Sequence, residues 1–451
     1  MTTTGLNLRS TTLRLVPDQS LYALMLLSTI VFWLLGILTL VQAIVVVVLA
    51  YTRAPSGVLA RLVALSWISI GVAQFCASIL AGIWREQPGE GIAQVASFGV
   101  MGWIVAGLAI WAGAAHRLSG RLIIRSITIL GGFIIALAAI GAVGVALGLP
   151  ALYSPYSLPL LIAPNSVSAR LYGSVAIYIS EETLGELTTR LILFYPYTTA
   201  LGLGGIGITL ISLLEKDWRF RLCGMAGGLI AVVFSWSRIS LGALVICAVG
   251  WCWLKASLKL RLAFVGLGLG TLFVLSIADV NWPEAIADLQ NRIDGVRAGS
   301  SLARQIIYEK SWEGFLQSPV FGHGWIGPSV HPKEMLPIGS HSTFYGLLYT
   351  GGALTFGAFA IAIAMTLVAG VIRLLTVSPE RRDEIIVMIL LSATLLIFCK
   401  YESLFSITLP CTYIFAFIGG ALEPRGEESS MPSTSPSQET RFSHERARPA
   451  A

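Results

Sequence analysis

Residues 122–149, LIIRSITILGGFIIALAAIGAVGVALGL, carry one charged side chain, Arg125, in an otherwise uncharged run. A helix needs about 20 apolar residues to cross a hydrocarbon core about 30 Å thick, because its backbone polar groups must all be satisfied internally. This run meets that length, and several others along the chain do too. The sequence therefore predicts an all-α, polytopic integral membrane protein.

The composition supports the same conclusion. Hydrophobic residues make up 55% of the 451 positions and charged residues only 12%, with a mean hydropathy of +0.78. Soluble domains carry about a quarter charged residues, so water cannot be the main solvent. The net charge of +6 does not indicate a nucleic-acid surface, because Lys and Arg fall in short clusters between apolar runs.

The apolar runs cover about residues 21–51, 58–84, 91–115, 122–149, 191–214, 222–254, 260–278, 341–375, 385–400 and 403–422. Runs 21–51 and 222–254 are long enough for two short spans or one tilted helix. The basic clusters fall on one side of the membrane only if both runs are hairpins, turning near Gly36 and at Ser237-Arg238. The prediction is then about 12 spans, with both termini in the cytoplasm.

This topology predicts one transmembrane domain over residues 1–422, with outer segments at about 150–190 and 279–340. The second outer segment contains a predicted surface helix at 302–317, where apolar and charged residues alternate at near-helical spacing. Residues 423–451 are rich in Ser, Pro and charge, and we expect them to form a disordered cytoplasmic tail.

The chemistry-bearing residues gather in and around the second outer segment. The predicted helix stops at Ser318-Pro319, and the two glycines of Phe321-Gly322-His323-Gly324 then permit a tight turn or a close backbone approach. His341 follows where the chain re-enters the membrane. A histidine at a span boundary can be a simple interfacial residue, so its neighbours decide its meaning.

Those neighbours resemble the O-antigen ligase and O-antigen polymerase superfamily. The resemblance rests on Arg304, on Ser318-Pro319-Val320-Phe321-Gly322-His323-Gly324, and on His341-Ser342 opening an apolar helix. Upstream it continues in Arg190 with Phe194-Tyr195-Pro196-Tyr197-Thr198, and in Ser235-Trp236-Ser237-Arg238. Two positions depart from the family pattern: Ser342 stands where Asn is common, and Thr350-Gly351-Gly352 where a Glu-Gly pair is frequent.

The resemblance implies a glycosyltransferase C-type membrane fold. It also implies metal-independent transfer of a glycan from undecaprenyl diphosphate to an acceptor at the periplasmic face. Arginine suits that donor, because its fork of charged donors matches phosphate oxygens. We expect Arg190 and Arg238 to clamp the diphosphate, with Arg304 a weaker candidate. Each of these arginines could instead be a flanking or snorkelling charge.

A neutral histidine is a suitable general base for a sugar hydroxyl, because its unperturbed pKa is about 6.5. We give that role to His341, and direct attack would invert the anomeric centre. His323 and Ser342 are possible substrate contacts. The sequence shows no obvious carboxylate cluster or Cys spacing for a metal, and no cofactor is expected.

The leading hypothesis is a polymerase of lipid-linked O-antigen, capsule or exopolysaccharide repeat units in a bacterial inner membrane. Rivals of the same class are an O-antigen ligase that uses lipid A-core as acceptor and a protein O-oligosaccharyltransferase. A lipid-linked oligosaccharide flippase or transporter is the rival from another class, and would favour midplane polar groups and internal duplication. Expected partners are membrane lipids and, in the same pathway, a chain-length regulator and a flippase.

Overall fold

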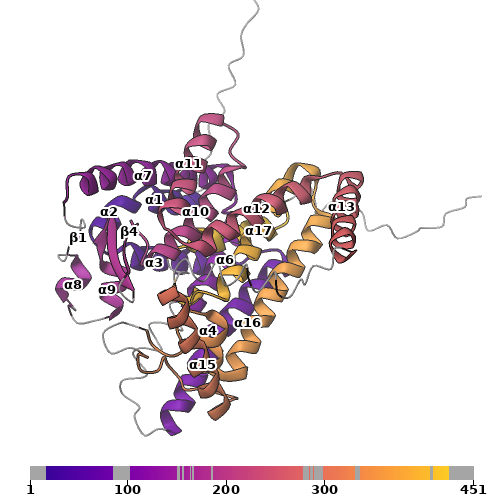
Figure 1. The fold of residues 1–451 in the computed structure, drawn as a ribbon. Helices are drawn as coiled ribbons and strands as arrows, with labels where there is room; N and C mark the ends of the chain where they lie inside the picture. The colour runs from indigo at the N-terminus through magenta and orange to yellow at the C-terminus, as the bar shows by residue number, and fades with distance from the viewer. Residues whose placement is uncertain are drawn as a thin grey trace, which may run out of the picture.

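The protein is described by a computed structural model over residues 17–84, 102–149, 186–277, 298–330, 336–406 and 410–425 and over parts of 153–183. The predicted tail beyond Arg425 lies outside these residues. Helices dominate the fold (Figure 1). In the first half they are α1 (Pro17–Leu27), α2 (Thr29–Leu34), α3 (Leu38–Thr52), α4 (Val58–Trp84), α6 (Val105–His116), α7 (Arg121–Ala146), α8 (Leu158–Ile162) and α9 (Val167–Gly173).

The second half continues the helical pattern. Its helices are α10 (Thr198–Ser212), α11 (Trp218–Phe234), α12 (Arg238–Lys255), α13 (Leu258–Ile277), α15 (Ala298–Gln317), α16 (Thr343–Thr376), α17 (Arg382–Cys399) and α18 (Thr412–Leu422), with 3-10 turns η2 (Pro379–Arg381) and η3 (Leu404–Ser406). Helix α15 confirms the helix predicted at 302–317 and starts four residues earlier.

Five of the described helices are long and apolar enough to cross a membrane: α4, α7, α12, α13 and α16. Helices α3, α6, α10 and α18 are apolar but shorter. The chain is thus a helical membrane protein, as predicted. The total of about 12 spans stays a prediction.

Both predicted hairpin turns are confirmed. Gly36, with φ of +72°, separates α2 from α3, and Ser235–Ser237 separate α11 from α12. A non-glycine side chain at Gly36 would be strained by this φ, and its Cβ would lie 2.4 Å from Cβ of Ser157.

The all-α prediction is wrong for the segment near 150–190, which contains short antiparallel strands. Strand β1 (Tyr153–Ser154) pairs with β2 (Val175–Ala176), and β3 (Tyr178–Thr183) pairs with β4 (Glu186–Leu191). The β3–β4 hairpin sets Ile179 opposite Arg190. Tyr, Ile and Thr favour extended backbone and recur in this segment, which sequence reasoning had treated only as a loop.

The core forms where small residues let helices approach closely. A Cβ added to Gly227 of α11 would lie 2.0 Å from the carbonyl oxygen of Gly131 in α7. A Cβ added to Gly113 of α6 would likewise lie 2.0 Å from the carbonyl oxygen of Ala416 in α18. Helices in lipid gain stability mainly from such close packing, because lipid offers no hydrophobic force between them. The bundle therefore holds its helix ends in fixed positions.

One end of the bundle carries a set of ion pairs. Arg125 donates two hydrogen bonds to the buried carboxylate of Glu215, at 2.7 and 2.9 Å, and thereby lowers the pKa of Glu215. Arg381 pairs with Glu384 at 3.0 Å, next to the end of α18. These residues belong to the basic clusters that sequence analysis assigns to the cytoplasm, and the candidate catalytic residues lie at the other end.

Candidate functional site

Four helix ends meet on the side of the bundle that carries the candidate residues. Helices α12 and α17 run antiparallel, because Lys255 pairs with Asp383 at 2.9 Å and Cys247 Sγ lies 3.1 Å from Thr394 Oγ1. The first residue of α12, Arg238, therefore lies at the same end as the last turn of α17.

Helices α10 and α16 begin at that end as well. A Cβ added to Gly202, in the second turn of α10, would overlap Oγ of Ser240 in the first turn of α12. Thr343, the first residue of α16, donates to the carbonyl of Glu402 at 2.7 Å, just beyond α17. The starts of α10, α12 and α16 are thus held around the end of α17.

The two arginines proposed as a diphosphate clamp are positioned by different elements. Arg190, on β4, is buried, and its Nη1 donates to Thr198 Oγ1 at 3.3 Å, at the start of α10. Arg238 is half-buried and begins α12, directly after the cap residue Ser237. Strand β4 packs against both α10 and α11, which brings Arg190 to the end of the bundle where Arg238 lies.

His341 stands immediately before α16 in a left-handed backbone conformation, with φ of +56°. Its carbonyl oxygen lies 3.0 Å from Oη of Tyr308 on α15, and the same hydroxyl lies 3.1 Å from the carbonyl of Lys400. Burial raises the pKa of Tyr308, so the hydroxyl stays protonated and donates. Tyr308 thus ties the His341 backbone to α15 and to the end of α17.

Arg304 is already paired, which changes its predicted role. Its Nη2 lies 2.9 Å from Oε1 of Glu402, whose side chain is 6% exposed. Sequence reasoning did not single out Glu402, because Arg304 and Glu402 are 98 positions apart. A buried carboxylate opposite Arg304 offsets its charge, so Arg304 suits positioning better than phosphate binding.

Tyr197 links the Arg190 side of the site to the Glu402 side. Its hydroxyl contacts Oγ of Ser406 and lies 3.4 Å from the carbonyl of Ser403. One connected set of contacts therefore runs from β4 and α10 through η3 to α15 and His341.

His323 and Ser342, the two possible substrate contacts, have structural partners. The His323 ring is buried, stacks on Tyr349 with centroids 4.5 Å apart, and has Nε2 2.8 Å from the carbonyl of Gly314. Ser342 is fully buried and caps α16 by accepting from the backbone N–H of Tyr345 at 3.4 Å. Both residues hold the start of α16 in place.

The turn after α15 that contains Gly322 and Gly324, and the Gly351-Gly352 segment of α16, are connected by main-chain hydrogen bonds; we call this connection the backbone joint. Helix α16 is kinked at Gly352, where φ is +63°, and the turn after α15 fits into this kink. The N–H groups of His323 and Gly324 donate to the carbonyls of Tyr349 and Thr350, at 2.7 and 2.8 Å. Thr350-Gly351-Gly352, which stands where the family pattern often has a Glu-Gly pair, lies at this joint. The joint fixes the short segment of α16 that follows His341.

Three of the four left-handed, non-glycine residues among the described residues lie at this end: Leu193, Trp236 and His341. The fourth, Arg117, lies between α6 and α7 at the opposite end. Leu193 follows Arg190 by three positions, Trp236 precedes Arg238 by two, and His341 is the third candidate itself. This conformation costs an L-residue about 1–2 kcal/mol, and such strain gathers at functional sites.

The helix starts add to the positive field of the arginines. Helices α10, α12 and α16 each direct an N-terminus toward this end, with N–H groups that have no partner within the helix and a partial positive charge. Together with Arg190 and Arg238 they form a region suited to a polyanion. The described residues include no group of three or more His, Cys, Asp or Glu side chains arranged to hold a metal.

Residues 223–360 match the family model described as O-antigen ligase, Wzy_C. This match supports the predicted O-antigen ligase and polymerase superfamily over this part of the chain. This O-antigen ligase region contains Arg238, Arg304, His323, His341 and Ser342, whereas Arg190 and Glu402 lie outside it. No curated protein matched the chain. The O-antigen ligase match and the apolar helices together identify a membrane protein with glycosyltransferase-like activity.

Proposed function

We propose that this protein is a polymerase that joins lipid-diphosphate-linked glycan repeat units, with undecaprenyl diphosphate as the carrier. One observation carries the proposal: the packing brings the start of α16, preceded by His341, to the end of the bundle where Arg238 begins α12 and Arg190 precedes α10. A diphosphate needs cations and N–H donors, and an acceptor hydroxyl needs a base. The site offers all three kinds of group.

In the proposed step, the acceptor sugar hydroxyl attacks the anomeric carbon of the donor from the face opposite the diphosphate. The new glycosidic C–O bond forms as the bond to the diphosphate oxygen breaks, and the bonding electrons leave with the diphosphate. The imidazole of His341 takes the hydroxyl proton. Arg190, Arg238 and the helix N-termini stabilise the departing charge, so no metal is required and the anomeric centre inverts.

The acceptor defines the second candidate. The description of the matching family, O-antigen ligase, favours lipid A-core as acceptor as much as a growing polysaccharide. The preference for a polymerase rests on the outer segments and on the departures around His341 and Gly352. We also propose a bacterial inner-membrane location, with both termini cytoplasmic and the site periplasmic, and a chain-length regulator and a flippase as pathway partners.

The deciding experiment uses the purified full-length chain in nanodiscs with an undecaprenyl-diphosphate-linked repeat unit and EDTA. We expect a ladder of products on a gel from the wild type and from Arg219→Ala, which changes an exposed arginine at the opposite end of the bundle. His341→Ala and Arg238→Ala should abolish the ladder, and Arg238→Lys should leave a weak one.

The alternatives give different results. Transfer only after lipid A-core is added would establish a ligase, and activity of His341→Ala would overturn the assigned base. An inert wild type with both acceptors, together with lipid-linked oligosaccharide movement across a vesicle membrane, would establish the transporter. Size-exclusion profiles of the variants separate loss of chemistry from loss of folding.

A further inference from the structure

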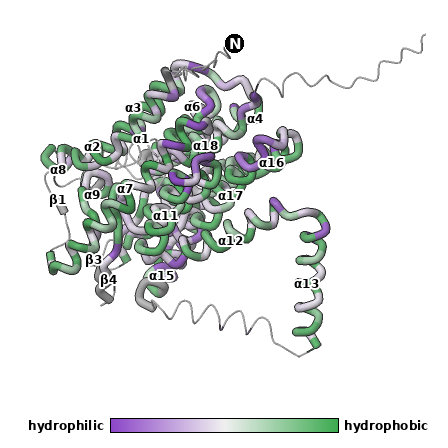
Figure 2. The backbone as a smooth tube through the Cα atoms, turned by 90° about the horizontal axis from the view of Figure 1, so that it is seen from above, coloured by the Kyte–Doolittle hydropathy of each residue, from purple (hydrophilic) through white to green (hydrophobic). Residues whose placement is uncertain are grey.

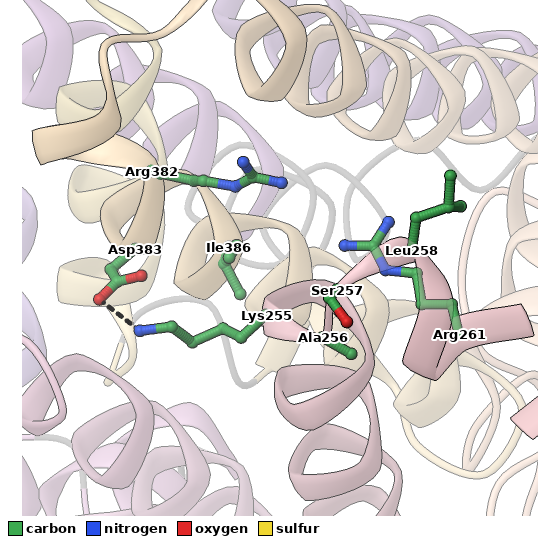
Figure 3. A pocket seen from close by; sticks show the side chains of 8 residues that line it. All are labelled: Lys255, Ala256, Ser257, Leu258, Arg261, Arg382, Asp383 and Ile386. Atoms are coloured by element: carbon green, nitrogen blue, oxygen red, sulfur yellow. Dashed lines mark hydrogen bonds and ion pairs between the residues drawn. The ribbon is translucent and has the colours of Figure 1, made fainter. Parts of the chain in front are cut away.

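A cleft lies at the end of the bundle opposite Arg238 and is lined mostly by cationic and polar groups. It is formed by the end of α12, the link to α13 and the first residues of α13 and α17 (Figure 3). Its charged lining residues are Lys255, Arg261, Arg382 and Asp383. Three cations face one carboxylate, so the cleft carries an excess of positive charge.

The ion pair in the cleft leaves two arginines with uncompensated charge. Lys255 and Asp383 neutralise each other at 2.9 Å. Arg261 donates to the carbonyls of Trp253 and Leu254 at 3.0 and 2.8 Å, which fixes its guanidinium at the cleft but brings no counter-charge. Arg382 is exposed, and no hydrogen bond or ion pair within the described part of the chain engages its guanidinium group.

The two guanidinium groups extend toward each other across the cleft (Figure 3). Two forks of N–H donors converging on one opening suit a phosphate group, which accepts several charge-assisted hydrogen bonds. The position also fits a headgroup layer. Trp251 lies about one turn before Lys255 and Trp253 about half a turn before it, and tryptophan is enriched where a bilayer meets water.

The wall next to the cleft is apolar. Helix α13 has no buried residue and stands apart from the bundle (Figure 2), and Leu262, Phe264 and Val265 on its first turns are 61%, 55% and 45% exposed. The outward side of α12 is also apolar, with Val245 62% exposed and Val249 64% exposed. Hydrocarbon chains can pack on these surfaces at no cost in polar desolvation.

We propose that this cleft binds the headgroup of an anionic phospholipid, with Arg261 and Arg382 on the phosphate and the acyl chains along α12 and α13. Basic pockets between transmembrane helices select anionic headgroups, because the charge of a zwitterionic lipid is already balanced. Free phosphate lacks the chains that would occupy the apolar wall. The bound lipid thus fills the space between α13 and the bundle.

The test is native mass spectrometry of the full-length chain after exposure to equal amounts of phosphatidylglycerol and phosphatidylcholine with identical acyl chains. The wild type should retain phosphatidylglycerol preferentially. Arg382→Gln should weaken that retention about fivefold, the equivalent of about 1 kcal/mol for one lost cation. Arg382→Lys keeps the charge and should retain most of the effect.

Arg219→Gln is the matched control, because it removes an exposed cation at the start of α11, outside the cleft, and it should leave retention unchanged. Arg261→Gln also removes a cap of α12, so Arg382→Gln, which removes no side-chain hydrogen bond or ion pair among the described residues, decides the outcome. Equal retention of both lipids by the wild type would overturn the proposal. Unchanged retention of phosphatidylglycerol by Arg382→Gln would also overturn it. So would binding of inorganic phosphate as strong as that of phosphatidylglycerol, or a dimer that carries no lipid in the cleft.

Discussion

His341 combines the proposed chemistry with an unfavourable backbone conformation. Its φ of +56° is one that glycine adopts freely and histidine does not. The conformation is held from outside the residue, by Tyr308 on its carbonyl and by the Ser342 cap that follows. Strain of this kind persists only where the surrounding contacts fix the backbone.

A His341→Gly substitution should therefore separate stability from activity. Glycine removes the left-handed strain from the folded state, but it raises the conformational entropy of the unfolded chain. These effects oppose each other, so the free energy of unfolding should change by less than about 1 kcal/mol. Removal of the general base should lower the rate about 10²- to 10⁴-fold. Thermal denaturation and a repeat-unit transfer assay on the same sample measure the two effects, and an active glycine variant would contradict the assigned base.

The Arg304–Glu402 pair makes a second prediction at this scale. Glu402→Gln removes the counter-charge of a partly buried arginine and should cost about 2 kcal/mol of unfolding free energy. Arg304→Met should cost a similar amount. In the double variant, the losses should overlap by about 1–2 kcal/mol.

Denaturation titrations of the four proteins, wild type included, give this coupling energy directly. Additive losses would show that the two side chains do not act as a pair. If kcat of Glu402→Gln falls by more than its loss of folded protein accounts for, Glu402 is a positioning residue for the site.

At the scale of elements, the joint between the turn after α15 and the kink of α16 orients the site. Gly322 and Gly352 both have positive φ, and the two backbones touch at these positions. Four backbone N–H groups cross between the segments, from His323, Gly324, Ala353 and Leu354. The interrupted helix thus keeps its polar groups satisfied, as a membrane requires.

Gly352→Ala should break this joint. The new Cβ would lie 2.3 Å from the carbonyl oxygen of Val320 at a φ that alanine resists, so we expect a loss of about 3 kcal/mol and a lower transfer rate. Gly357→Ala, one and a half turns later in open space, is the control and should stabilise α16 by about 0.5–1 kcal/mol. Equal melting temperatures for the two variants would contradict the proposed constraint.

At the scale of the whole molecule, the fold places two different groups of charged residues at the two ends of the helix bundle. Basic residues and their ion pairs, such as Arg125–Glu215, occupy one end, and the site with Arg190, Arg238 and His341 occupies the other. The positive-inside rule predicts that the first end faces the cytoplasm. The arginines at the opposite end run against that rule, as a functional role would require.

Cysteine labelling tests this orientation. In a background without the six native cysteines, Ser180→Cys on β3 and Lys216→Cys before α11 both place an exposed thiol, at opposite ends of the bundle. A membrane-impermeant maleimide should label Ser180→Cys in cells with a permeable outer membrane. It should label Lys216→Cys only after the inner membrane is opened, and labelling of both from one side would refute the topology.

The sequence by itself determined the membrane environment of the protein, most helices and both hairpin turns, and it predicted the candidate residues from Arg238 to His341. These features leave local patterns: apolar runs, glycine turns and a spaced motif. The sequence analysis missed the short strands β3 and β4. Their residues favour extended backbone, but an extended segment forms a hairpin only when it pairs with a second one. The predicted amphipathic helix formed, but its buried residues include Ala303 and Ile307, whereas Ile306 is 38% exposed.

Only the tertiary structure decided how the site residues are held. It paired Arg304 with Glu402, engaged His323 with Tyr349 and Ser342 with the carbonyl of Cys399, and brought the starts of α10, α12 and α16 to one end. These contacts join segments far apart in the chain, so no local pattern records them. Their physical origin is burial: a charge or polar group removed from water must find its partner wherever packing places one.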